Sequence, residues 1–151
     1  MIDSFVQDNN ASRQRLAAFV PALSPKDLVR SNADGWTVSA LLAHMAFHDR
    51  RHLVLLQRWK ARGVDFSPLD SDAINDAMQP ICLALEPRAA GALCLAAAEA
   101  VDAEVETLTD ELLGEIQASG SWFRPNRSLH RNAHLDEIES LLQAGQRPGR
   151  P

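Results

Sequence analysis

The five histidines of this 151-residue chain fall into two groups with helical spacing. His44, His48 and His52 follow one another at intervals of four residues, and His130 and His134 repeat that interval near the end of the chain. Residues four apart lie one turn apart on the same face of an α-helix, close enough for two imidazole rings to reach one ion. The spacing therefore indicates a metal site built by two helices.

Both groups share their helical faces with large apolar residues, so we expect them to point into the protein interior. A buried imidazole needs partners for a donor and an acceptor nitrogen, and a divalent metal removes that cost by taking a lone pair. Imidazole nitrogens suit zinc, nickel, copper and iron, of which zinc and nickel are favoured, and three such ligands leave a coordination position open for water or substrate. The apolar residues are Leu41, Met45 and Leu55 in the first group and Ile138 and Leu141 in the second.

Two histidines of the first group have other expected roles. His48 lies one turn beyond His44, where three roles stay open: a fourth ligand, a group that supports the ligands, or a general base. His52 drifts around the helix relative to His44 and is followed by apolar residues, so we expect it at the boundary of the interior. Asp49 is five residues from His44 and points to another face, which makes it a weaker proton acceptor.

Apolar residues recur with helical periodicity along almost the whole chain. Thr37 is a natural N-cap for the second long helix, and Gly63 supplies the residue that closes it. Pro87 suits the first turn of the third long helix. The stripe of that helix expected to face the core includes Leu93. The polar stretch 114–127 contains glycine and proline and is predicted to be an irregular connection. The expected long helices cover about residues 4–19, 37–62, 87–108 and 128–144.

Four amphipathic helices without a strand signal predict an all-α fold, a four-helix bundle. The segment SDAINDAM (71–78) lies between the second and third long helices and is expected to form a short extra helix. We expect residues 1–144 to make a single domain and residues 145–151 to form a flexible tail, since the tail has no apolar residues to pack.

Composition excludes several classes of function. A net charge of -5 argues against nucleic-acid binding, which needs a basic face to displace counterions from phosphates. The longest apolar run, Ala89–Ala98, is too short to span a membrane, and the first ten residues lack a signal peptide. Cys82 and Cys94 have neither metal-site nor redox spacing and are expected to be buried thiols. These features predict a cytoplasmic protein with a small-molecule substrate, for which a homodimer is one expected assembly.

Two stretches of the chain resemble the DinB/YfiT-like superfamily of four-helix bundles. GWTVSALLAHMAFHD (35–49) is similar to the superfamily pattern of a tryptophan, a helix cap and a histidine eight residues after the tryptophan. SLHRNAHLDEIESLL (128–142) is similar to its closing HxxxHxxEI helix. This resemblance implies a divalent metal held by His44, His130 and His134. Some members are similar to thiol-dependent enzymes such as mycothiol-dependent maleylpyruvate isomerase, and others look like thiol S-transferases or metal-dependent hydrolases.

The preferred hypothesis is a metal-dependent transferase or hydrolase that acts on a small molecule, with a low-molecular-weight thiol as a candidate cofactor. The metal would lower the pKa of a bound water or thiol, and His48 would accept the proton. Arg124, Arg127 and Arg131 would bind carboxylates of the thiol or substrate, or would form a solvated rim. Two alternatives are a non-catalytic metal- or ligand-binding protein and a helical scaffold with core histidines.

Overall fold

The computed structural model describes residues 2–144, and the regular structure of this part of the chain is helical, which confirms the predicted all-α class. The predicted tail, 145–151, lies outside the described residues. The helices of the described part are α1 (Ile2–Ala22), α2 (Pro25–Leu28), α3 (Val38–Arg62), α4 (Ser71–Leu83), α5 (Pro87–Val105), α6 (Asp110–Ala118) and α7 (Ser128–Ala144). No helix of the described residues is long and apolar enough to cross a membrane.

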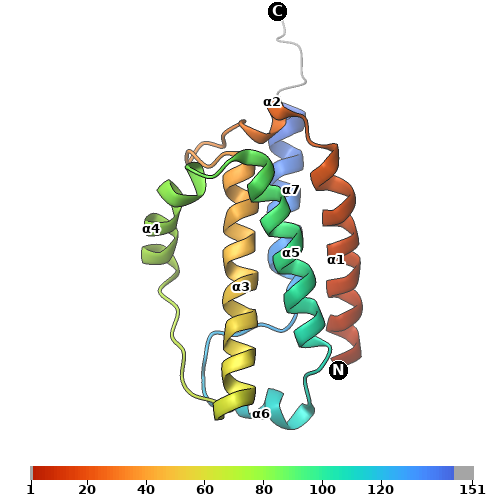
Figure 1. Ribbon diagram of the computed structural model, residues 1–151, viewed down its shortest axis with the longest axis vertical. Coiled ribbons are helices and arrows are strands. Elements are labelled where there is room, and N and C mark those ends of the chain that lie inside the picture. Colours follow the sequence, from red (N-terminus) through yellow and green to blue (C-terminus); the bar gives the residue numbers. More distant parts are fainter. Residues whose placement is uncertain (1, 145–151) are drawn as a thin grey trace, which may run out of the picture.

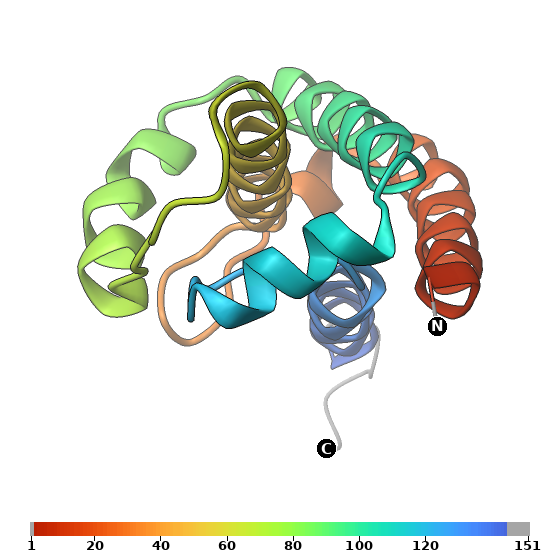
Figure 2. The same cartoon turned by 90° about the horizontal axis from the view of Figure 1, so that it is seen from below.

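The four long helices α1, α3, α5 and α7 run side by side (Figures 1 and 2). α5 packs against both α3 and α1, and α7 packs against both α1 and α3. α4 packs on the outside of α3, and α6 crosses the lower end of the long helices (Figure 2). The predicted extra helix in the connection between the second and third long helices corresponds to α4.

Local signals in the sequence set the ends of the helix that carries the first histidine group. The Thr37 hydroxyl accepts a hydrogen bond from the Ala40 backbone N–H at 3.1 Å, which caps the start of α3. Gly63 ends α3 with a positive φ of 85° that other residues rarely adopt. Both boundaries are as predicted, and so is the start of α5 at Pro87.

Two sequence predictions about the segment after α5 were wrong. α5 ends at Val105, three residues before the expected end, and α6 occupies Asp110–Ala118, which overlaps the connection predicted to be irregular. α6 forms because the Thr109 hydroxyl accepts from the Leu112 backbone N–H, and because Leu113 and Ile116 are buried below the long helices.

The apolar core has two large clusters, an upper and a lower one, and a smaller third cluster between α3, α4 and α5. The upper cluster includes Leu16, Met45 and Leu135, and the lower one includes Leu56 and Trp59. Leu93, predicted to face the core, is 51% exposed instead, because α5 turns its small residues toward α3. On α3, the buried residues between these two clusters are His48, Asp49 and His52, so a polar layer separates the clusters.

Close packing between α5 and α1 depends on Gly91. A Cβ atom at this position would lie 2.9 Å from Val20 Cγ1, so Gly91→Ala is expected to destabilise the fold by about 1–3 kcal/mol through overpacking. Gly114→Ala is the matched control, because a Cβ there meets open space and should stabilise α6 by about 0.5–1 kcal/mol. Urea denaturation of both variants measures the difference, and equal stabilities would contradict this packing argument.

Candidate metal centre

The two histidine groups meet between α3 and α7. His44, His130 and His134 each offer one ring nitrogen, and these three atoms all lie within 4.8 Å of one another. The Nε2 atoms of His44 and His130 are 3.3 Å apart. The ring centroid of His134 lies 4.8 Å from that of His44 and 4.8 Å from that of His130. The structure therefore brings together the three residues to which the family resemblance assigned the metal.

The chemistry of these nitrogens fits a divalent transition metal. His134 Nδ1 lies 3.0 Å from Glu137 Oε2, so the ring donates to this carboxylate and its Nε2 keeps a free lone pair. The facing Nε2 atoms of His44 and His130 need a shared proton or a cation between them. His44 Nδ1 is buried without a hydrogen-bond partner among the described residues, so no protein group competes with a cation for the orientation of this ring.

The environment of these imidazoles favours their neutral, ligand-competent form. Burial, followed by the neighbouring His134 and His48, lowers the pKa of His44 to about 3. Burial also lowers the pKa of His130, with the positive charge of Arg127 as the next cause. Arg127 Nη2 lies 3.5 Å from His130 Nδ1, at the outer limit of a hydrogen bond, so this contact is weak.

A cavity of about 390 Å³ opens beside the three rings. This volume is within the range of small-molecule sites. Four of the five histidines line it, and Trp36 packs edge-on against His44 with ring centroids 5.5 Å apart. Other residues that line the cavity are Asn32, Asn75, Trp122 and Glu137.

His48 lines the same cavity next to the three rings. Its ring centroid is 4.6 Å from that of His44 and 5.1 Å from that of His130, but it is not one of the three residues whose ligand atoms cluster. Burial and then the charge of Arg127 lower its pKa to about 4, although Asn75 opposes the shift. His48 is therefore neutral at pH 7 and is a proton acceptor of low basicity.

His52 lies in the interior, whereas the sequence indicated a boundary position. It is fully buried, and its Nδ1 donates to the His48 carbonyl at 2.7 Å. Its Nε2 accepts from the Arg124 backbone N–H at 3.3 Å and from Arg127 at 3.2 Å. His52 connects α3 to the segment before α7 and takes no part in the histidine cluster. A single sequence cannot reveal this role, because the partners lie more than seventy residues away.

Two of the three arginines expected at the substrate lie inside the protein. Arg127 pairs with Asp49 at 2.8 Å, and Arg131 pairs with Asp49 at 2.9 Å and with Asp102 at 2.8 Å. Their side chains are 1% and 0% exposed, and neither lines the cavity. Arg127 and Arg131 therefore have a structural role. They form neither the substrate contacts nor the solvated rim that the sequence indicated. Arg124 is exposed, with its guanidinium 5.6 Å from the centroid of the Trp122 ring.

Sequence reasoning missed the ion-pair roles of the two acidic residues in this network. Asp49 and Asp102 are 1% and 2% exposed. The signal was their position, because each follows apolar residues of a core-facing stripe, on α3 and α5 respectively. Asp49 was expected to point to another face than His44, and it pairs with Arg127 and Arg131.

The buried imidazoles predict a loss of stability in mild acid for the metal-free protein. Burial lowers the pKa of His44 to about 3, of His48 to about 4 and of His52 to about 2, whereas unfolded histidine titrates near 6.5. Between the lowered pKa of each folded ring and pH 6.5, the unfolded chain binds protons that the folded protein does not bind. The contribution of the neutral imidazoles to the free energy of unfolding is therefore fully present above about pH 6.5. It falls as the pH drops, by up to about 1.4 kcal/mol per pH unit for each imidazole.

Urea denaturation of the metal-free protein between pH 7 and pH 5 measures this loss, in a range where most carboxylates stay ionised. The expected result is a midpoint that moves steadily to lower urea concentration, with a smaller shift in His52→Phe than in the unsubstituted protein. A midpoint that stays constant over this range would contradict the neutral, buried state of these rings.

Comparison with known proteins supports the resemblance seen in the two motifs. Residues 10–124 match the family model described as mycothiol maleylpyruvate isomerase N-terminal domain. The matched segment includes His44 and His48 and ends before His130 and His134. No curated protein and no solved structure matches the chain. Because the match spans most of the chain, this protein belongs to the mycothiol maleylpyruvate isomerase N-terminal domain family, within the DinB/YfiT-like helical superfamily.

Proposed function

We propose that this protein is a metal-dependent transferase or hydrolase that acts on a small molecule. In this proposal His44, His130 and His134 hold one divalent transition metal, zinc or nickel, and the four long helices form the four-helix bundle that positions them. The observation that carries the proposal is the cavity of about 390 Å³, because it borders all three rings and gives a substrate access to the centre.

When bound, the metal supplies Lewis acidity and lowers the pKa of a water or thiol that it coordinates. His48, at the cavity wall, would be placed to accept a hydrogen bond or a proton from a molecule in the cavity. Asn75 lines the same cavity beside His48, and it is the group that opposes the lowering of the His48 pKa. Trp122 offers an aromatic face in the same wall. The family description makes a low-molecular-weight thiol the favoured co-substrate.

The test is cobalt substitution, because cobalt(II) reports changes in coordination through its visible spectrum. N-acetylcysteine added to the cobalt-loaded protein should produce a sulfur-to-cobalt charge-transfer band, and N-acetylserine, which differs only in the sulfur atom, should not. The band should survive in His48→Gln if His48 lies outside the coordination sphere. A spectrum unchanged by the thiol would favour a closed centre and the alternative of a non-catalytic metal-binding protein.

Glu137 is expected to tune the affinity of the centre for metal. Its Oε2 accepts from His134 Nδ1, and its Oε1 accepts from Asn32 Nδ2 at 2.8 Å, so the carboxylate fixes the ring orientation. Glu137→Gln should weaken zinc binding by about 10–100-fold in a competition titration. Glu139→Gln is the matched control on the same helix, because its partner is Arg15 at the surface. Equal zinc affinities for the two variants would contradict the role of Glu137.

A further inference from the structure

A second cavity, of about 470 Å³, lies on a different face of α3 from the histidines. It is enclosed by α3, α4 and α5, and its walls are almost entirely apolar. Met78 and Cys82 contribute buried surface from α4, and Phe47, Ile81 and Leu93 are 41%, 65% and 51% exposed around the opening. Exposed apolar side chains gathered around a cavity offer a surface for the apolar part of a ligand.

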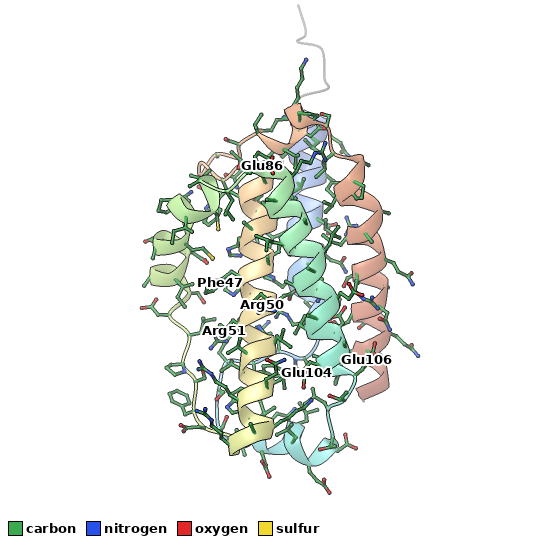
Figure 3. All side chains as sticks on the ribbon, viewed as in Figure 1. Phe47, Arg50, Arg51, Glu86, Glu104 and Glu106 are labelled. Atoms are coloured by element: carbon green, nitrogen blue, oxygen red, sulfur yellow. The ribbon has the colours of Figure 1, made fainter. Side chains whose placement is uncertain are left out.

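A neighbouring cavity of about 380 Å³ continues along α3 and shares Phe47 and Arg50 with the first. Its walls add two further arginines, Arg51 and Arg58, beside Val54. We call the two cavities together the outer groove. Phe47, Arg50 and Arg51, which all line the second cavity, lie together at the middle of α3 (Figure 3). The outer groove therefore has an apolar end near α4 and α5 and a cationic end farther along α3.

The cationic end carries unneutralised charge. Arg51 donates to the carbonyls of Trp122 and Pro68, which fixes its guanidinium. Arg50 and Arg58 make no ion pair and no side-chain hydrogen bond within residues 2–144, and no acidic residue of this part lines either cavity. Free guanidinium groups beside an apolar cavity complement an anion attached to an apolar body.

We propose that the outer groove binds an amphipathic monoanion, a molecule with an alkyl body and one carboxylate or sulfonate group. The alkyl body lies against Leu93 and Met78, and the anionic group is bound by Arg50, with Arg58 adding positive charge. The volumes of the two cavities match small-molecule sites, and the charge pattern selects the anion over a neutral or cationic analogue. The proposal does not depend on the metal centre, because none of the four cavity histidines lines the outer groove.

Isothermal titration with dodecanoate, below the concentration at which it forms micelles, tests the proposal. We expect saturable binding of one molecule per chain and much weaker binding of dodecyltrimethylammonium, which carries the opposite charge. Arg50→Gln should weaken dodecanoate binding about tenfold, since it removes one charge-assisted hydrogen bond. Ala96→Phe, which fills the apolar end from an exposed position on α5, should weaken it at least as much.

Two controls separate this site from general effects. Lys26→Gln removes one positive charge from exposed α2 and should bind dodecanoate as the unsubstituted protein does. His130→Ala should also bind it unchanged, which distinguishes a failure of this proposal from a failure of the metal centre. Absence of saturable binding, equal affinity for the cationic analogue, or a stable dimer in sedimentation velocity that dodecanoate does not dissociate would each overturn the proposal. The last result would assign the apolar face to a second copy of the chain.

Discussion

His130→Ala is expected to abolish stoichiometric metal binding while leaving the protein folded. His130 provides one of the three clustered ligand atoms, and its Nε2 lies 3.3 Å from that of His44. Loss of an outer partner of a ligand alone typically costs 10–100-fold in affinity, so loss of a ligand should exceed about 100-fold. The fold should survive, because His130 is only partly buried and belongs to neither of the two large apolar clusters.

Metal content measured by elemental analysis, together with a zinc titration and the far-ultraviolet circular dichroism spectrum, tests this prediction. His48→Ala is the matched control, since His48 borders the same cavity but lies outside the cluster of ligand atoms. That variant should retain one metal per chain. Retention of metal by His130→Ala would show that the centre is built from other residues. Complete unfolding of the variant would show instead that the metal is structural.

Arg131→Ala is expected to cost about 3–5 kcal/mol of folding stability, the usual penalty for breaking a buried ion pair. Arg131 is fully buried and donates to both oxygens of Asp102 and to Asp49. Without it, Asp102 keeps only Arg13, which is 36% exposed and 3.3 Å away. The loss is a large part of the 5–15 kcal/mol that stabilises a typical domain.

Urea denaturation measures this loss of folding stability, and two further variants serve as comparisons. Arg15→Ala breaks surface ion pairs to Asp136 and Glu139 and should cost only about 0.2–1 kcal/mol. Arg131→Met retains most of the side-chain volume, so comparison with Arg131→Ala separates the loss of charge from the cavity left behind. If Arg131→Ala were as stable as Arg15→Ala, the buried network would not contribute to stability.

Local sequence signals predicted the helices well because each acts over one or two turns. The structure places a helix boundary at each of three predicted positions. The hydroxyl group of Thr37 caps a helix start, the backbone freedom of Gly63 ends a helix, and the ring of Pro87 suits a first turn. α6 was missed because it is only nine residues long and has Gly114 in its interior, which weakens the local helix signal that Thr109 provides at its start. Only two buried residues, Leu113 and Ile116, hold it against the rest of the protein. A helix that depends on such tertiary contacts has a weak local signal.

The histidine spacing by itself determined that two helices each carry imidazoles on one face, since that depends only on helical periodicity. Tertiary structure alone decided which nitrogens meet, how the cavity opens beside them, and where the arginines lie. Asp49 and Arg127 pair across 78 positions of the sequence, and Asp102 and Arg131 pair across 29. Such partners are chosen by the packing of α3, α5 and α7. For this reason two arginines expected at the substrate are instead buried beside carboxylates that no local pattern marks as their partners.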